Sequence, residues 1–201
     1  MKVLLVGATG DIGKAIKQEL SKDTKIITAS YSKSDITVDL ASSESINKMY
    51  QSIGKIDAVI CAAARGVLFS LLSEMDATKY ASSFQCKLLG QIDLVIQGLS
   101  YLNAQGSFTL TTGLLNVDPI TQGSAAAVVN SGIEGFIVVA AIDMPQQLRI
   151  NAVSPALLTE SKDRYGSLFP GYETVSAEKV ALSYRKSVDG KHTGKIYRVG
   201  W

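Results

Sequence analysis

The first pattern that could do chemistry is a glycine-rich turn near the start of the chain. Residues 3–13 read VLLVGATGDIG, an apolar run followed by glycines at positions 7, 10 and 13. A strand that turns into a helix at such glycines presents free backbone N–H groups and the positive end of the helix dipole, which together hold a pyrophosphate. Gly7 permits the turn, Gly10 lets the backbone approach phosphate, and Gly13 lets helix and strand pack closely. The pattern predicts a dinucleotide site; the alternative is a merely tight turn.

The elements that would position this turn alternate along the whole chain. Short apolar runs alternate with segments of helical period, which is typical of strand–helix–strand units that form a parallel sheet. The expected strands span residues 2–7, 25–29, 35–39, 56–61, 107–112, 149–153 and 195–199. The expected helices span residues 11–22, 42–54, 76–103, 124–142 and 176–187. The irregular segment 154–174 follows a central strand, where parallel sheets bind ligands, and is the candidate substrate lid.

Composition excludes several classes of partner. The 201 residues carry 20 Lys and Arg against 18 Asp and Glu, with no long basic run, so we expect neither a nucleic acid nor an anionic membrane as partner. Cys61, Cys86 and the single His192 match no zinc pattern, so we expect reduced thiols and no metal site. The longest apolar stretch, residues 133–142, is far below membrane-spanning length, and the first apolar run is too short for a signal peptide. These features favour a cytoplasmic protein.

Several motifs in the same order resemble the short-chain dehydrogenase/reductase family, NAD(P)-dependent enzymes built on a single Rossmann domain. The likeness rests on GATGDIG at residues 7–13, on Asp39-Leu40 after the third strand, on Cys61-Ala62-Ala63-Ala64 where the family usually has Asn-Asn-Ala-Gly, and on INAVSPA at residues 150–156. It covers nearly all of the chain. The GxxGxxG spacing looks more like the extended or atypical branches of the family.

This resemblance implies the fold and the cofactor contacts. The fold is expected to be α/β: one Rossmann domain, residues 1–201, with a doubly wound seven-stranded parallel sheet and helices on both faces. The residues that would contact a nicotinamide dinucleotide are Gly7, Thr9, Gly10, Asp11, Ile12, Gly13, Ser30, Tyr31, Ser32, Asp39, Leu40, Cys61, Ala62, Ala63 and Pro155. In the family, Asp39-Leu40 would lie at the adenine and Pro155 beside the nicotinamide.

The end of the second strand favours NADP(H) over NAD(H). A carboxylate there would hold the adenosine ribose and repel a 2′-phosphate, but residues 28–33 contain none. Ser30 and Ser32 could donate hydrogen bonds to the phosphate, Lys33 could supply charge, and Tyr31 could stack on the adenine. The alternative is that these are solvated loop residues without a ligand contact, which for Lys33 alone is the better interpretation.

The acid–base pair of the family is missing. Members use Tyr-x-x-x-Lys on the helix after the fifth strand, and the register set by residues 134–136 places Ala126 and Asn130 at those positions. The serine of the fifth strand is matched by Thr112, and the asparagine of the preceding helix by Lys87. Since the Asn and Lys positions of the family lie close together, Lys87 and Asn130 are a reciprocal exchange.

Three hypotheses follow. In the first, the chain is an atypical oxidoreductase for a small carbonyl or alcohol, in which Lys87 polarises or protonates the substrate, Asn130 positions Lys87, and Thr112 holds the substrate oxygen. Tyr165 or Tyr172 of the lid is an alternative source of a phenol. In the second, the chain is a catalytically silent NAD(P)H-binding sensor or regulatory protein. In the third, no dinucleotide binds. Separately, the alternative to a catalytic role is that Lys87 is a solvated or interface lysine, that Ala126 and Asn130 are ordinary helix residues, and that Thr112 is a strand-end hydroxyl without a substrate.

The resemblance also implies self-association. Related folds pair the long helices of two subunits into four-helix bundles, so we expect a homodimer or homotetramer. The residues expected at this contact are Gln91, Leu94, Val95, Ile133, Phe136 and Ile137.

Overall fold

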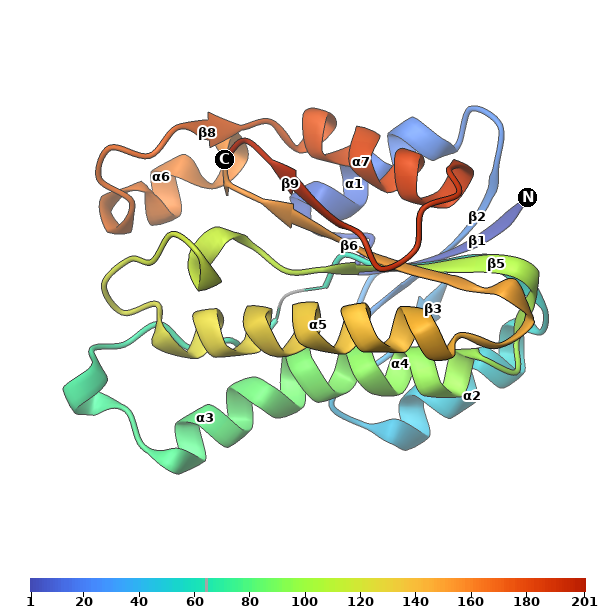
Figure 1. Cartoon of the computed structure of the whole chain (residues 1–201), viewed down its shortest axis with the longest axis horizontal. Helices are drawn as coiled ribbons and strands as arrows, with labels where there is room; N and C mark the ends of the chain where they lie inside the picture. Colours follow the sequence, from blue (N-terminus) through green and yellow to red (C-terminus); the bar gives the residue numbers. More distant parts are fainter. Residues whose placement is uncertain (64) are drawn as a thin grey trace.

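Seven parallel strands form one sheet in the order β3-β2-β1-β4-β5-β6-β9, with helices on both faces (Figure 1). The structure is a computed structural model and describes residues 1–63 and 65–201, so Ala64 of the fourth-strand motif lies outside the described residues. The strands are β1 (Lys2–Val6), β2 (Lys25–Ser30), β3 (Ile36–Thr37), β4 (Ile56–Cys61), β5 (Leu102–Thr111), β6 (Arg149–Pro155) and β9 (Ile196–Val199). The predicted α/β fold with a seven-stranded parallel sheet is confirmed.

Two helical layers bury the sheet from opposite sides. One layer holds α1 (Asp11–Leu20) and α7 (Ala177–Asp189), and the other holds α2 (Ser43–Ile53), α4 (Gly90–Gly98) and α5 (Ser124–Asp143) (Figure 1). Side chains alternate along a strand, so β1 contributes to the apolar cores on both faces of the sheet. Leu4 and Val6 belong to one apolar cluster, and Val3 and Leu5 belong to the other. The strand is therefore apolar at consecutive positions, as the sequence suggested.

The predicted long helix over residues 76–103 is present as one continuous helical run over residues 77–98, but its predicted end is wrong. The run consists of α3 (Ala77–Ser83), a π-helical segment (Phe84–Leu89) and α4, and β5 begins as early as Leu102. Leu102 is buried and pairs with Ile56, so its apolar side chain belongs to the sheet and not to a helix. Helical spacing alone cannot separate these two environments, because both bury an apolar side chain.

The candidate lid is more ordered than the predicted irregular loop. Within residues 154–174, β7 (Leu157–Leu158) pairs in parallel with β8 (Thr174–Val175), and α6 (Lys162–Tyr165) lies between them. The pairing of Leu157 with Thr174 closes the two ends of the segment against each other. The segment lies beyond the carboxyl end of β6 (Figure 1).

The faces of α4 and α5 correct the expected subunit contact. Gln91, Leu94, Val95, Ile133 and Ile137 are buried inside the chain, against the sheet, so they are not available to a partner, and Phe136 is only partly exposed. The apolar residues that these helices do expose are Ile96, Val128, Val138, Val139 and Ile142. By length and composition alone α5 could cross a membrane, but here one face of it packs in the core.

Candidate functional site

The glycine turn joins β1 to α1 with very little space for side chains. Gly7 has a positive φ of 86°, and a Cβ on it would lie 2.6 Å from the backbone nitrogen of Ala63. A Cβ on Gly13 would lie 2.1 Å from the Gly7 carbonyl oxygen, so helix and strand meet here without a side chain between them. At Gly10 a Cβ would meet only the Gly7 oxygen, at 3.7 Å, which leaves this part of the turn open.

The N-terminus of α1 is free to bind an anion. Gly10 is its N-cap, and within the described part of the chain no side chain accepts a hydrogen bond at this cap. The N–H groups of the first turn, at Asp11, Ile12 and Gly13, have no partner inside the helix. They point toward the turn together with the positive end of the helix dipole. The turn thus has the donors and the clearance that a diphosphate requires.

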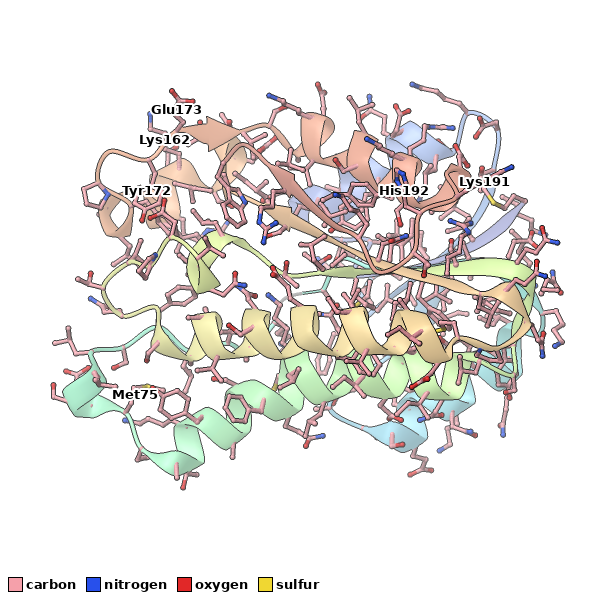
Figure 2. All side chains as sticks on the ribbon, in the orientation of Figure 1. Met75, Lys162, Tyr172, Glu173, Lys191 and His192 are labelled. Atoms are coloured by element: carbon pink, nitrogen blue, oxygen red, sulfur yellow. The ribbon has the colours of Figure 1, made fainter. Side chains whose placement is uncertain are left out.

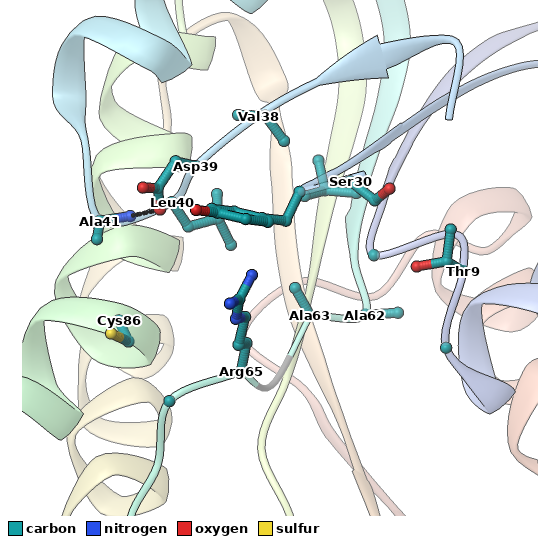
Figure 3. Close-up of a pocket in the computed structure, with 15 residues that line it drawn as sticks. Thr9, Ser30, Val38, Asp39, Leu40, Ala41, Ala62, Ala63, Arg65 and Cys86 are labelled. Atoms are coloured by element: carbon teal, nitrogen blue, oxygen red, sulfur yellow. Dashed lines mark hydrogen bonds between the residues drawn. The ribbon is translucent and has the colours of Figure 1, made fainter. Parts of the chain in front are cut away.

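A pocket of about 440 Å³ opens beside this turn (Figure 3). It runs from the glycine turn past the end of β2 to the loop after β3 and the loop after β4. Its lining residues are Val6, Gly7, Thr9, Gly10, Ser30, Tyr31, Val38, Asp39, Leu40, Ala41, Ala62, Ala63, Arg65, Gly66 and Cys86. Nine of the predicted cofactor residues are among them, and the shape and the open turn fit the adenosine diphosphate part of a dinucleotide.

Other predicted cofactor residues do not line this pocket. Asp11, Ile12 and Gly13 lie in the first turn of α1, where their N–H groups have no partner inside the helix. The Cys61 side chain is fully buried in the core, and this burial raises the pKa of its thiol to about 11. Pro155 is buried at the end of β6.

The loop after β3 is held in place by its own polar groups. A carboxylate oxygen of Asp39 accepts a hydrogen bond from the Ala41 N–H at 3.0 Å, and the Asp39 N–H donates to the Ser45 hydroxyl at 2.9 Å. A Cβ on Gly90 would lie 2.6 Å from the Leu40 carbonyl oxygen, so α4 packs directly on this loop. Asp39 and Leu40, which line the part of the pocket predicted to hold the adenine, are therefore held in place by these contacts.

The polar residues predicted to select NADP(H) are arranged differently from the prediction. The buried hydroxyl of Ser30 donates to the Ser32 carbonyl and contacts the Ser34 hydroxyl at 2.7 Å. Ser32 is exposed, and neither Ser32 nor Lys33 lines the pocket. Tyr31 does line it, stacked against the guanidinium of Arg65 at 3.9 Å. The sequence analysis did not predict Arg65 as a site residue, because it follows the fourth-strand motif and belongs to no motif itself.

Lys87 is a buried cation in the π-helical segment. Its Nζ donates to the Asn130 side-chain oxygen at 3.0 Å and reaches the Thr112 carbonyl oxygen at 3.4 Å. Asn130 is itself fixed by a hydrogen bond from its Nδ2 to the Gly113 carbonyl at 3.1 Å. Burial lowers the pKa of Lys87 to about 8, since desolvation disfavours the ammonium form. The contact between Lys87 and Asn130 is the one that the reciprocal exchange predicts.

Thr112 does not present its hydroxyl as predicted. The side chain is buried, and its hydroxyl donates to a carboxylate oxygen of Glu134 at 3.3 Å. Glu134 in turn lies 3.8 Å from the guanidinium of Arg198. Thr112 contributes its carbonyl, not its hydroxyl, to the surroundings of Lys87, so the expected substrate contact through this hydroxyl has no support in the geometry.

An apolar cluster surrounds Ala126, the residue that the predicted register matches to the family's tyrosine. Ala126 is buried with Leu114 and Leu115, and partly buried side chains pack on these three. The partly buried residues are Val67, Ile120, Phe169, Tyr172 and Trp201. The Tyr172 hydroxyl donates to Asp118 at 2.9 Å, and Tyr165 stacks on Phe69, so neither phenol contacts Lys87. The lid closes over apolar side chains.

Residues at the margins of the lid have structural partners. Glu160 accepts a hydrogen bond from the Ala177 N–H at the start of α7 at 2.9 Å, and the Thr159 hydroxyl donates to Thr174 at 3.1 Å. Figure 2 shows Tyr172 on the lid and His192 far from it, near the end of α7. The His192 carbonyl accepts a hydrogen bond from Asn151 at 2.8 Å, in keeping with a structural role for this turn.

Known proteins resemble the chain over its whole length. Residues 2–187 match the family model described as enoyl-(acyl carrier protein) reductase. A protein of Listeria innocua, lin1944, superposes with a TM-score of 0.97 at 46% identity, with 98% of each chain covered. A small-chain dehydrogenase solved in complex with NADPH superposes with a TM-score of 0.86 at 25% identity, covering 99% of this chain and 96% of the other.

A curated relative agrees with these matches. The short-chain dehydrogenase/reductase ucsE of Acremonium sp. is 24% identical over 193 residues, covering 79% of this chain and 73% of the relative. The sheet, the glycine turn and the pocket beside it define a dinucleotide-binding Rossmann protein. The chain belongs to the short-chain dehydrogenase/reductase family, a family of oxidoreductases that use nicotinamide cofactors.

Proposed function

We propose that this chain binds NADP(H) in the pocket beside the glycine turn and reduces a small carbonyl compound, with Lys87 as the proton donor. The observation that carries this proposal is the placement of the Lys87 ammonium. An ammonium has three N–H donors, and the two oxygens of Asn130 and Thr112 take two of them. Among the described residues no further acceptor lies within hydrogen-bonding distance, so one N–H remains for a substrate oxygen.

The electrostatics of Lys87 suit proton donation near neutral pH. In the described part of the chain no carboxylate lies within salt-bridge distance of Nζ, and burial brings the pKa down to about 8. A general acid works best when its pKa lies near the pH of the reaction. When bound, the reduced nicotinamide supplies the hydride for the carbonyl carbon; Lys87 supplies the proton for the oxygen and regains one from water.

The other residues of this site position Lys87. Asn130 fixes the ammonium with one oxygen and is itself fixed by the Gly113 carbonyl. Replacement of the family's tyrosine by Ala126 leaves no phenol at its usual place, so Lys87 takes over protonation in this proposal. The preceding residue, Cys86, lines the cofactor pocket, so Lys87 is adjacent in the chain to this lining but is not itself part of it.

The test is turnover of NADPH with a panel of small aldehydes and ketones. Lys87→Met should abolish turnover and leave NADPH affinity within about threefold, because Lys87 does not line the pocket. For the unmodified chain, carbonyl reduction should fall as the pH rises through about 8, where Lys87 loses its proton. Asn130→Ala, as a positioning variant, should move this pH dependence. Unchanged turnover in Lys87→Met contradicts the proposal.

A second function is favoured by the apolar cluster at Ala126. Leu114 and Leu115 are almost fully buried there, which supports a catalytically silent protein that binds NAD(P)H as a sensor or regulator. This alternative predicts binding of NADPH without hydride transfer to any carbonyl of the panel. It also predicts that Lys87→Met binds NADPH with the same affinity as the unmodified chain.

We further propose a homodimer or homotetramer built on the exposed faces of α4 and α5. Ile96, Val138, Val139 and Ile142 are each more than half exposed and apolar. Exposed apolar residues gathered on neighbouring helices favour association. The mass of the purified chain, measured by light scattering, tests this.

A further inference from the structure

Arg65 and Tyr31 stack on each other in the lining of the pocket beside the glycine turn. The guanidinium carbon of Arg65 lies 3.9 Å from the centre of the Tyr31 ring, and both residues line the pocket. Figure 3 shows Arg65 extending into the pocket. Arg65 lies in the loop after β4, and the Tyr31 ring on which it stacks follows the end of β2. Two segments far apart in the sequence thus meet at the side of the pocket next to Ser30.

The stacking leaves the hydrogen-bond donors of Arg65 free. A guanidinium that stacks on a ring uses its flat face, while its five N–H donors lie in the plane and point outward. Among the described residues, no carboxylate lies within 4.0 Å of these nitrogens, and no hydrogen-bond acceptor satisfies them. Such a preorganised planar cation is suited to a phosphate monoester.

The other candidate groups at this place are already committed. The Ser30 hydroxyl is bound within its own loop, and the carboxylate of Asp35 accepts hydrogen bonds from the Thr28 N–H and hydroxyl. Lys33 does not line the pocket. Arg65 is therefore the cationic side chain, among the described lining residues, that an additional phosphate on the ribose would meet.

We propose that Arg65, held by Tyr31, binds the 2′-phosphate of the adenosine ribose and thereby selects NADP(H) over NAD(H). This inference rests on the proposed dinucleotide binding. The pocket extends from the open glycine turn to Asp39 and Leu40, so a diphosphate at the turn and an adenine at the far end place the ribose between them. The side of the pocket along this stretch is formed by Ser30, Tyr31 and Arg65.

The experiment compares two fragments that differ only in one phosphate. Binding of 2′,5′-ADP and of 5′-ADP is measured by calorimetry for the unmodified chain, Arg65→Met and the matched control Lys33→Met. Because Arg65→Met removes a charge-assisted contact, its affinity for 2′,5′-ADP should fall by about 10- to 100-fold. Its affinity for 5′-ADP should stay within about threefold of that of the unmodified chain. Lys33→Met should bind both fragments as the unmodified chain does. Since Arg65 is exposed, its substitution should leave folding intact.

Other outcomes overturn the inference in distinguishable ways. Equal weakening of both fragments in Arg65→Met means that Arg65 contacts only the adenine or the diphosphate. No weakening of either fragment means that Arg65 makes no contact with the ligand. In both cases the proposed function stands, because the unmodified chain binds the fragments. If the unmodified chain binds neither fragment nor NADPH, the proposed function fails together with this inference.

Discussion

Burial of Lys87 makes the stability of the fold depend on pH in a defined direction. The pKa of this lysine is about 8 in the folded chain, against 10.5 for an unperturbed lysine. Between these values the unfolded chain binds more protons than the folded chain, so the free energy of unfolding rises with pH. Below the folded pKa both states are protonated, and the full cost of burying the ammonium remains.

The magnitude follows from the two pKa values of this lysine. Each pH unit that separates them corresponds to about 1.4 kcal/mol, so Lys87 should raise the free energy of unfolding by about 1.3 kcal/mol between about pH 7 and pH 9. Cys61 acts in the opposite direction, because burial raises the pKa of its thiol from 9.0 to about 11. The effect of Cys61 on the free energy of unfolding over the same interval is smaller, about 0.4 kcal/mol. A Lys87 variant still contains Cys61, so this effect cancels when the two proteins are compared.

The assay is denaturant unfolding of the unmodified chain and of Lys87→Met across this pH interval, followed by circular dichroism. Methionine leaves the oxygens of Asn130 and Thr112 without their donor at every pH, so the absolute stability of the variant is not the readout. The readout is the difference between the two pH slopes, which should be about 1.3 kcal/mol over the interval. Parallel slopes would refute the argument that Lys87 is a buried cation with a lowered pKa.

Three further predictions concern the glycine turn and the outer helices. Gly10→Asp should abolish NADPH binding in calorimetry while changing stability by less than about 1 kcal/mol, because a Cβ there meets only the Gly7 oxygen at 3.7 Å; retained binding would contradict it. Gly13→Ala should destabilise the fold by about 3 kcal/mol or more in denaturant unfolding, because its Cβ would lie 2.1 Å from the same oxygen; an unchanged midpoint would contradict it. Val139→Glu combined with Ile142→Glu should yield monomers by light scattering, and a monomeric unmodified chain would disprove the proposed interface.

Features encoded by a few neighbouring residues were predictable from the sequence. The strand over residues 56–61 and the turn at Gly7, Gly10 and Gly13 follow from apolar runs and glycine spacing, which act locally. The contact between Lys87 and Asn130 was also predictable, because the family resemblance supplied the long-range register.

Features that depend on tertiary packing were not predictable in the same way. Both α4 and α5 carry apolar residues on more than one face, so the sequence could not tell that Leu94 and Ile133 face the core while Ile142 faces outward. The hydroxyl of Thr112 turns to Glu134, a partner 22 positions away that no spacing rule indicates. Arg65 owes its place to the loop after β4 meeting the end of β2.

The central claim is that the turn between β1 and α1 binds a diphosphate. A crystal structure of the chain grown with NADPH tests this most directly. We expect diphosphate oxygens at about 2.7–3.2 Å from the N–H groups of Ile12 and Gly13, with the adenine against Leu40. A crystal in which only solvent occupies this turn at saturating NADPH, or in which the diphosphate lies elsewhere, would contradict the account.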